Sequence, residues 1–479
     1  MSLDALFRFR AGREIGGGHA IRCLSLAEEL HALGWDCALA CNAEATQVVG
    51  ALQRSAVRLA DEGADPVTDL LVIDDYGVDA AEEDRQRLRA QRLLVIDDLA
   101  DHRHLCEILM DPTPGGTAAL HAANVPGDCR LLLGPKFAPL RPAFRRARQR
   151  ALARRGPDGI GRVLVMPGQV DQADLATLAF GAIRQALPDA EIDIVLGAGA
   201  PHRARLERDV GAGVAIHVDL DAEAMADLMV AADLAIGAGG GGALERCALA
   251  LPTVLVIVAD NQKHIAAGLD AVGAAHVAGW IADVDRDGLA SVLEVLSAEP
   301  SRLKAMSDGA GELCDGYGTR RFAIAAVAPF KDSDAGDVML RRAEAGDAET
   351  MYAWQSDPET RRFARNPEVP SWEGHVAWLN RKLDDEDCVF AIVEQDAKPA
   401  GLIRLDREGG DAEVSIVIAP DRRGQGLGKA TLALARRLLP RDRLTAFVKP
   451  ENLASKRLFE QAGYMPAQDN MLQQLPRAA

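Results

Sequence analysis

A histidine follows three glycines near the start of the chain, in the string Ile15-Gly16-Gly17-Gly18-His19-Ala20-Ile21-Arg22. Apolar side chains at helical spacing after it predict that His19 begins a helix, where free backbone N–H groups can bind a phosphate. The positive end of the helix dipole favours a neutral imidazole, so we expect His19 to accept a proton from water. Arg22, one turn later, would steady a diphosphate or a sugar oxygen. Alternatively, His19 only caps the helix and the glycines form a tight turn.

A second glycine run, Gly237-Ala238-Gly239-Gly240-Gly241-Gly242, follows the strand-like segment Leu234-Ala235-Ile236. Four consecutive glycines let the backbone approach a diphosphate closely, and Glu245 in the following helix could accept hydrogen bonds from ribose hydroxyls. Asn261 and Gln262 follow the next strand at its carboxyl end, which is the edge where open α/β sheets bind ligands. The pattern predicts an anion site in this part of the chain.

A third glycine loop, Arg423-Gly424-Gln425-Gly426-Leu427-Gly428, connects a predicted strand at 413–418 to a predicted helix at 429–439. It opens with arginine and contains no candidate base, so its amides suit a phosphate rather than a proton transfer. Glu413 on the preceding strand could accept a proton from an amine, directly or through water. The alternative for Glu413 is a surface carboxylate on an edge strand. The three loops together predict phosphate-bearing ligands and two chemistries on one chain.

Short apolar runs alternate with amphipathic helical stretches over the first 325 residues, which is typical of parallel sheets covered on both faces. The runs lie at 70–74, 93–97, 163–166, 192–196, 234–236 and 254–258. A basic segment at 144–162 interrupts the series, so we predict two Rossmann-like halves, 1–150 and 151–330. The polar stretch 331–337 is predicted to be a linker. From residue 338 to 479 the regular alternation of strands and helices ends, and the pattern predicts a separate α+β domain.

Composition restricts the class of protein. The 479 residues are 48% apolar and 26% charged, with a net charge of −17, which argues against nucleic acid or an anionic membrane as the main partner. The chain has no apolar run of spanning length, and its first residues do not resemble a signal peptide. Its eight cysteines form no C-x-x-C pair and suit reduced core residues. We therefore expect a cytoplasmic enzyme.

Several separated motifs in the first 325 residues resemble one family. They are Phe7-Arg8, the I-G-x-G-H-x-x-R-C-L string at 15–24, IDDYG at 73–77, IDDLA at 96–100, GPKFAPLR at 134–141, and the second glycine run with Glu245, Asn261 and Gln262. The family is the UDP-2,4-diacetamido-2,4,6-trideoxy-β-L-altropyranose hydrolase of pseudaminic acid biosynthesis, a pathway that serves flagellin glycosylation. Its members are related to glycosyltransferases with two Rossmann halves (the GT-B arrangement).

The resemblance implies inverting, metal-independent hydrolysis of a UDP-sugar at the anomeric carbon, which releases UDP and the free sugar. It makes His19 the base that activates or orients water, places Tyr76 beside the sugar, and places Glu245 and Asn261 beside UDP. The substrate contacts expected from the motifs are Arg8, Gly18, Arg22, Tyr76, Arg141, Gly239, Gly240, Gly241, Glu245, Asn261 and Gln262.

The chain departs from this family at two positions. The family usually has an acidic residue where Arg10 stands and a glycine where Gln169 stands. Arg10 weakens any role for a carboxylate beside His19, and Gln169 would narrow the cleft between the halves. His102, His104 and Cys106 alternate at a spacing that metal ligands on a strand can have, but no fourth ligand lies nearby. We expect no metal.

The third loop resembles the R/Q-x-x-G-x-G/A acetyl-CoA loop of the GNAT superfamily of N-acetyltransferases. A second motif about 30 residues later, N-x-x-[AS]-x-x-L-[YF]-x-x-x-G-[FY], begins at Asn452 and ends at Tyr464. The resemblance spans about 338–470 and implies acetyl-CoA as co-substrate. The residues expected to hold it are Ile418, Arg423, Gly424, Gly426, Gly428, Lys429, Asn452 and Ser455.

The acid that protonates the departing thiolate is left open, because Phe459 stands where this superfamily often has a tyrosine. Tyr464, Tyr352 or water would have to serve. The segment at 354–357, with His375 and Trp378, is similar to the nucleotide-sugar N-acetyltransferase of the same pathway. His375 could therefore contact the substrate, or His375 and Trp378 could form a helix face packed in the core.

The two resemblances together imply consecutive reactions on one sugar nucleotide. The acetyltransferase would acetylate the 4-amino group of a UDP-4-amino-4,6-dideoxy sugar, and the hydrolase would then remove UDP. Expected partners are these small molecules and the next enzymes of the pathway. The alternatives are a glycosyltransferase with two Rossmann domains and an appended acetyltransferase, a non-catalytic nucleotide-sugar binder, and an acetyl domain that modifies protein N-termini.

Overall fold

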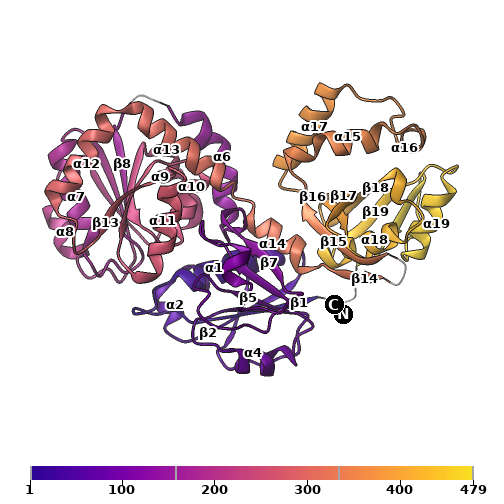
Figure 1. Ribbon diagram of the computed structural model, residues 1–479, viewed down its shortest axis with the longest axis horizontal. Helices are drawn as coiled ribbons and strands as arrows, with labels where there is room; N and C mark the ends of the chain where they lie inside the picture. The colour runs from indigo at the N-terminus through magenta and orange to yellow at the C-terminus, as the bar shows by residue number, and fades with distance from the viewer. Residues whose placement is uncertain (1–2, 157–158, 333–334, 477–479) are drawn as a thin grey trace. The chain divides into compact units, whose positions relative to one another are not determined.

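A computed structural model describes residues 3–156, 159–332 and 335–476. Three β-sheets with covering helices make up the fold (Figure 1). Described residues within 5–29 and 37–319 form one compact unit, and those within 3–4, 30–36 and 320–476 form the other. Among the described residues, no helix combines the length and the apolar composition that crossing a bilayer requires.

The first sheet has seven strands in the order β3-β2-β1-β4-β5-β6-β7. Its pairs β2–β3, β1–β4, β4–β5, β5–β6 and β6–β7 are parallel. The strand order reverses between β1 and β4, which is the point where doubly wound sheets bind ligands. The strands are β1 (Asp4–Phe9), β2 (Asp36–Cys41), β3 (Arg58–Asp61), β4 (Leu70–Asp74), β5 (Leu93–Ile96), β6 (Ile108–Asp111) and β7 (Arg130–Leu133).

Helices connect these strands, and the helix after β4 begins at a capping residue. Asp79 accepts a hydrogen bond from the Glu82 N–H at the start of α4, whose last turn contains Arg85 and Arg87. All five residues of β4 are buried, as expected of a strand covered on both faces. The helices are α1 (Gly18–Ala32), α2 (Ala45–Val48), α3 (Ala51–Arg54), α4 (Ala80–Arg87), α5 (Ala118–His121) and the 3-10 turn η1 (Pro135–Phe137).

The second sheet has six parallel strands in the order β10-β9-β8-β11-β12-β13, with its reversal between β8 and β11. Alternate side chains of β8 enter two different apolar clusters, one on each face, because successive residues of a strand point to opposite sides. The strands are β8 (Arg162–Met166), β9 (Glu191–Leu196), β10 (Val214–Val218), β11 (Leu234–Ala238), β12 (Thr253–Ile257) and β13 (His276–Trp280).

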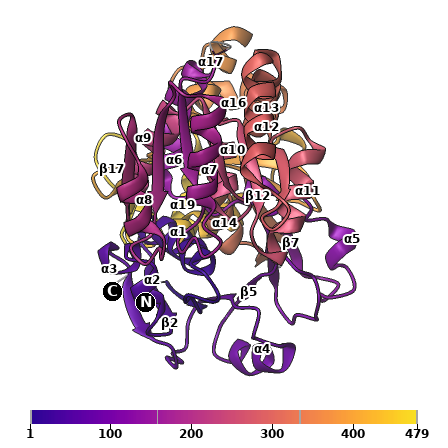
Figure 2. The ribbon, with the colours of Figure 1, turned by 90° about the vertical axis from the view of Figure 1, so that its left-hand side faces the viewer.

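Two helical layers cover the second sheet (Figures 1 and 2). One contains α6 (Pro142–Arg154), α9 (Ala222–Ala231), α10 (Gly242–Ala248) and α11 (Lys263–Ala271), and the other α7 (Leu175–Ala186), α8 (Arg203–Asp209) and α12 (Arg286–Ala298). The 3-10 turn η2 (Asp260–Gln262) precedes α11, and α13 (Pro300–Leu313) and α14 (Gly318–Ala326) follow. The boundary predicted between residues 150 and 151 falls inside α6. Because α6 packs its apolar face into this layer, the basic segment is a covering helix rather than only a connector.

The third sheet is mixed, in the order β14-β15-β16-β17-β18-β19-β21-β20, and only β18–β19 is parallel among its described pairs. The predicted linker 331–337 contributes to β14 and β15, and its residues 333 and 334 lie outside the described part. The strands are β14 (Phe330–Asp332), β15 (Gly336–Arg342), β16 (Cys388–Gln395), β17 (Lys398–Glu408), β18 (Asp411–Ile418), β19 (Arg443–Phe447), β20 (Met465–Pro466) and β21 (Met471–Gln474).

Helices on the third sheet are α15 (Ala348–Ser356), α16 (Pro358–Phe363), α17 (Trp372–Asp384), α18 (Leu427–Leu438) and α19 (Leu453–Gln461), with 3-10 turns η3 (Ala345–Asp347) and η4 (Pro420–Arg422). An apolar cluster joins α15 and α17 to β16 and β17. The predicted fold class, two parallel Rossmann-like halves followed by an α+β part, is confirmed.

Candidate functional site

His19 lies where the first sheet reverses its strand order. Its Nδ1 is 2.6 Å from Oδ1 of Asp74, the last residue of β4, and both side chains are buried. A carboxylate partner fixes Nδ1 as the protonated nitrogen, which leaves a lone pair on Nε2. Nε2 makes no hydrogen bond within the described residues and is not among their buried unpaired atoms, so it reaches solvent. This geometry presents a base.

Arg22 completes the neutralisation of Asp74. Its Nε and Nη2 donate to the two carboxylate oxygens at 2.9 and 2.7 Å. Burial by itself would raise the pKa of Asp74, but the charges of Arg22 and His19 outweigh it and hold that pKa below the usual value. Asp74 therefore stays ionised and orients His19. Asp74 lies in the IDDYG motif at 73–77, but the motif alone does not indicate that it contacts His19.

The charge chain continues to the next strand. Arg22 Nη1 donates to Asp98 Oδ2 at 2.8 Å, and the Tyr76 hydroxyl donates to Asp98 Oδ1 at 2.5 Å. Burial and the Asp98 carboxylate raise the pKa of Tyr76, so its hydroxyl stays protonated. The Tyr76 ring packs edge-on against His19, with 4.6 Å between ring centres. The structure thus brings three predicted residues, His19, Arg22 and Tyr76, into one cluster.

Three other arginines of the first half point elsewhere. Arg8 donates to the Ala64 carbonyl, and Arg141 donates to Glu28 on α1 at 3.2 Å. Arg10, at a position that departs from the family, makes a two-point ion pair with Asp75. The carboxylate beside His19 is Asp74 from β4, and the effect of Arg10 at its position stays a prediction. Substrate contacts of Arg8 and Arg141 stay predictions.

A buried ionic network lies directly behind this cluster. His104 is 2% exposed and contacts Glu83 at 2.6 Å through Nδ1 and Asp97 at 3.2 Å through Nε2. His121 contacts Asp111 at 3.0 Å. Asp97 also accepts from the Leu99 and Ala100 amides and immediately precedes Asp98, so the network anchors the loop that carries Asp98. His104 is accordingly an ion-pair residue. No group of three or more metal-ligating side chains suited to an ion occurs among the described residues.

In the second half, the glycine run connects β11 to α10. The Gly239 N–H donates to Gln262 Oε1 at 3.1 Å, and the same oxygen accepts from the Val258 N–H. Gln262 therefore holds the loop and the end of β12 together. Among the described residues, the N–H groups of Gly240 and Gly241 have no acceptor. Asn261 is exposed beside them. The loop offers free donors to an anion.

Glu245 lies in the first turn of α10 and is only partly exposed. Burial raises its pKa to about 7, although Arg246 and Arg141 favour the charged form. At neutral pH this carboxyl group therefore changes charge easily, and it can donate or accept a hydrogen bond. The next residue, Arg246, is fully buried, which no feature of the sequence indicated.

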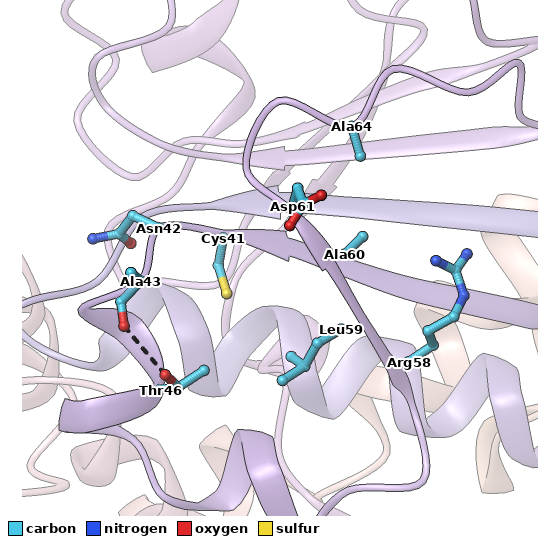
Figure 3. A pocket seen from close by; sticks show the side chains of 9 residues that line it. All are labelled: Cys41, Asn42, Ala43, Thr46, Arg58, Leu59, Ala60, Asp61 and Ala64. Atoms are coloured by element: carbon cyan, nitrogen blue, oxygen red, sulfur yellow. Dashed lines mark hydrogen bonds between the residues drawn. The ribbon is translucent and has the colours of Figure 1, made fainter.

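Figure 3 shows a separate open pocket of about 450 Å³ at the carboxyl ends of β2 and β3. Its lining residues are Cys41, Asn42, Ala43, Thr46, Arg58, Leu59, Ala60, Asp61 and Ala64. The Asn42 side chain pairs with the Ala11 backbone: its Oδ1 accepts from the Ala11 N–H at 3.0 Å, and its Nδ2 donates to the Ala11 carbonyl at 2.9 Å. Burial raises the pKa of the Cys41 thiol, so it is not an activated nucleophile. None of the predicted site residues lines this pocket.

In the third sheet, β18 and β19 separate. Their parallel register runs from Asp411 to Glu413 opposite residues 443–445, although β18 continues to Ile418. Glu413 stands at the last paired position, where the gap begins. Its Oε2 is 3.1 Å from Nη2 of Arg365, whose guanidinium lies 4.8 Å from the Phe447 ring centre. A partly exposed carboxylate at this point can meet an incoming amine.

The 423–428 loop enters α18 through two glycines in the left-handed region, with φ of 79° at Gly424 and 78° at Gly426. Among the described residues, the N–H groups from Gly424 to Gly428 have no acceptor. Arg423 turns away from the loop and donates to Asp357 at 2.9 Å and Thr360 at 2.7 Å. Direct contact between Arg423 and a cofactor stays a prediction, whereas its side chain here ties the loop to α16.

The other predicted cofactor residues lie around α18 and α19. Lys429 follows the loop within α18, and Asn452 Oδ1 caps α19 by accepting the Ser455 N–H at 3.1 Å. A β-carbon on Gly428 would lie 2.8 Å from Leu458, so glycine lets the two helices meet closely. Their contacts with acetyl-CoA stay predictions.

The tyrosines considered as acids have other surroundings. Tyr464 is 3% exposed, and its ring packs edge-on against Phe459 with 4.9 Å between centres. Burial raises its pKa, although the charge of Arg436 in the last turn of α18 opposes this. The Tyr464 hydroxyl is buried and has no hydrogen-bond partner among the described residues. The Tyr352 hydroxyl donates to the Pro370 carbonyl at 3.0 Å.

His375 packs in the helical layer above the third sheet. It is 1% exposed, and its Nε2 donates to the Ala348 carbonyl at 3.0 Å. Its ring stacks within 6.0 Å of Tyr352, Trp372 and Trp378. A side chain this deeply enclosed cannot touch a substrate in this conformation. The structure therefore favours the core-face alternative over the predicted substrate contact.

Residues 337–465 match the family model described as the acetyltransferase (GNAT) domain. This part of the chain is a GNAT acetyltransferase domain, as its two motifs predicted. The match leaves the two parallel-sheet halves outside its bounds.

The chain is also similar to the spore coat polysaccharide biosynthesis protein SpsG of Bacillus subtilis, with 28% identity over 200 residues. This covers 41% of the chain and 58% of that protein, so the chain spans little more than half of the relative's length. Among solved structures, Acinetobacter baumannii MurG aligns with 16% identity and a TM-score of 0.48, over 67% of this chain and 98% of that one. Mycobacterium smegmatis RimJ with CoA-disulfide aligns with 18% identity and a TM-score of 0.26, over 29% and 83%.

The His104 network predicts a pH-dependent loop. Burial alone would lower the pKa of His104, but Asp97 and Glu83 raise it to about 9. Because the unfolded value is about 6.5, the stabilisation is complete below that pH and is lost as the pH rises through about 9. It amounts to about 3 kcal/mol. Hydrogen exchange of residues 97–105, corrected for intrinsic rates, should therefore show protection that falls between pH 6.5 and 9.5.

His104→Gln should abolish this pH dependence and weaken protection at pH 7, because the imidazolium is gone. His264→Gln, at an exposed position of α11, is the matched control and should behave like wild type. An unchanged pH profile in His104→Gln would assign the dependence to other groups.

Gly424 predicts how much the loop conformation contributes to cofactor binding. No heavy atom would lie within 4 Å of a β-carbon there, so a substitution acts only through the positive φ. Gly424→Val should weaken acetyl-CoA binding about tenfold, from about 1–2 kcal/mol of backbone strain, measured by calorimetry. Gly424→Asn should stay close to wild type, because asparagine tolerates this region. Gly346→Val, at an open position, is the control; equal affinities of the valine and asparagine variants would contradict the argument.

Proposed function

We propose that the chain is a bifunctional enzyme of the pseudaminic acid type. Its acetyltransferase domain would transfer acetyl from acetyl-CoA to the 4-amino group of a UDP-4-amino-4,6-dideoxy sugar. Its two Rossmann-like halves, about 1–150 and 151–330, would then hydrolyse the acetylated UDP-sugar to free sugar and UDP. The observation that carries the hydrolase assignment is the buried His19–Asp74 pair, whose Nε2 reaches solvent at the reversal point of the first sheet.

In the proposed hydrolysis, His19 Nε2 takes a proton from water as the water oxygen attacks the anomeric carbon. The bond from that carbon to the β-phosphate oxygen breaks, and UDP leaves with the electron pair. The proton stays on the imidazole, whose positive charge Asp74 stabilises from the other side of the ring. The free N–H groups of Gly240 and Gly241 suit the negative charge of the leaving diphosphate.

In the proposed acetyl transfer, the amine attacks the thioester carbonyl, and Glu413 takes its proton directly or through water. The C–S bond breaks, and the CoA thiolate leaves. The free amides from Gly424 to Gly428 suit the pyrophosphate of CoA, and the gap between β18 and β19 begins beside Glu413. Support for a carbohydrate substrate comes from the polysaccharide-biosynthesis relative.

The proposal predicts which products form. Incubation of the full chain with acetyl-CoA and the UDP-4-amino sugar, followed by mass spectrometry and NMR, should give UDP and the N-acetylated free sugar. His19→Ala should stop the sequence at the acetylated UDP-sugar and lower the rate of UDP release about 10²–10⁴-fold. Asp74→Asn should act in the same direction, because it removes the partner that fixes the tautomer. Undiminished UDP release in His19→Ala would overturn the hydrolase assignment.

For the acetyl transfer we predict the converse: a variant that loses this reaction and keeps the hydrolysis. Glu413→Gln should lower acetyl transfer about 10²–10⁴-fold, with acetyl-CoA affinity unchanged, because the amine proton loses its acceptor. Hydrolysis of a pre-acetylated UDP-sugar should stay at the wild-type rate, so His19→Ala and Glu413→Gln control for each other. Glu408→Gln, at an exposed position of β17, is the surface control. A wild-type acetylation rate in Glu413→Gln would dismiss Glu413 as the base.

The second candidate function is a glycosyltransferase with an appended acetyltransferase, because two parallel sheets can serve either chemistry. It differs in its product. A glycoside that forms only when an acceptor is added, with no free sugar in its absence, would decide for the transferase.

A further inference from the structure

Arg246 is a buried guanidinium without a carboxylate partner. It is 1% exposed and is the largest fully buried side chain of the described residues. Its Nη2 donates to the Ala238 carbonyl at 2.8 Å, and its Nη1 lies 4.0 Å from the Met166 sulfur. Its Nε has no hydrogen-bond partner in the described ranges of the chain. Across the described part of the chain, no acidic side chain lies within ion-pair distance of it. A buried charge in such surroundings carries a large desolvation cost.

The charge persists at neutral pH. Burial lowers the pKa of Arg246 to about 10, which still leaves the guanidinium protonated. Glu245, the adjacent residue, is the nearest titratable acid on α10, and burial raises its pKa to about 7. Glu245 is therefore a weak counter-charge, and within the described part of the chain no acceptor replaces the lost hydration of the Arg246 Nε.

Arg246 lies directly behind the second glycine run. A β-carbon on Gly237 would be 2.6 Å from Nη1, and one on Gly242 would be 3.7 Å from the same atom. Its hydrogen bond to Ala238 holds the carbonyl at the start of the run. The Gly239 N–H is taken by Gln262, and those of Gly240 and Gly241 have no acceptor among the described residues. The loop thus has a cation behind it and two unoccupied donors.

We propose that Arg246 is the positioning residue of the diphosphate site, whose buried charge is balanced only when a nucleoside diphosphate binds to the 239–242 loop. This inference rests on the proposed function for the ligand and adds a residue that acts on it through the loop. Arg246 does not touch the phosphates. It holds the Ala238 carbonyl, and its positive charge acts across one layer of backbone, where few atoms screen it.

Removing the charge of Arg246 should affect the stability of the unliganded protein and its affinity for UDP in different ways. Arg246→Met keeps an unbranched apolar stem and removes the unpaired cation, so the unliganded protein should melt at the same or a higher temperature. Its affinity for UDP, measured by calorimetry on the full chain, should fall ten- to a hundredfold. Its affinity for uridine, which carries no phosphate, should change less than twofold. The UDP-induced rise in melting temperature should shrink accordingly.

Two further variants keep the test decisive. Arg246→Gln retains a donor for Ala238 but no charge, and should show the same selective loss of UDP affinity if Arg246→Met does not fold. Arg208→Met removes an equal charge from the exposed surface of α8 and should leave both affinities unchanged.

Equal weakening of UDP and uridine, or an unchanged UDP affinity, would overturn the proposal and leave Arg246 as a packing residue. A wild-type chain that binds uridine but gains nothing from the diphosphate would also overturn it. A wild-type chain that binds neither UDP nor uridine would refute the proposed function itself, and the inference with it.

Discussion

The carboxylate of Asp74 is fully enclosed at the end of β4, and an enclosed anion is tolerable only when donors surround it. His19 and Arg22, three residues apart on α1, supply those donors. Any other orientation of His19 would leave Asp74 short of a partner. His19 is therefore oriented before a ligand arrives, and the same arginine extends the constraint to Asp98, which follows β5 and accepts a hydrogen bond from the Tyr76 hydroxyl. Two carboxylates, Asp74 and Asp98, thus fix the geometry of the cluster.

The surroundings of Arg246 differ in charge balance from the His19 cluster. In that cluster, and in the His104 network behind it, acids and bases neutralise one another within the protein. Behind the 239–242 loop, the Arg246 cation has no such partner among the described residues. Balanced charges suit a site that must hold a base in one orientation, whereas an unbalanced cation suits a site whose ligand brings the negative charge. Under the proposed function, the first half would orient the base and the second half would bind the anion.

Sequence patterns located the loops, but they could not identify the partners of the side chains. A glycine run after a strand reflects local backbone geometry, so all three loops and the fold class could be predicted. The Asp74 partner of His19 is 55 positions away, and only strand order brings them together. The burial of His375 depends on how α17 packs on the sheet. The spacing of His375 and Trp378 is compatible with either a buried or a substrate-facing helix side, so the sequence could not decide between them. Arg246 could not be identified in this way, because no sequence pattern distinguishes an unpaired buried arginine from a paired one.

Under the proposed function, a thiolate leaving group makes little demand on an acid. Phe459 cannot donate a proton, and the Tyr464 side chain is enclosed in the protein. A thiol ionises near pH 8.5, so a departing thiolate is already a stable anion close to neutral pH, unlike an alkoxide. Water at the open end of the β18–β19 gap can protonate it after the bond has broken. Deprotonation of the amine is the harder transfer, and Glu413 stands at the start of that gap.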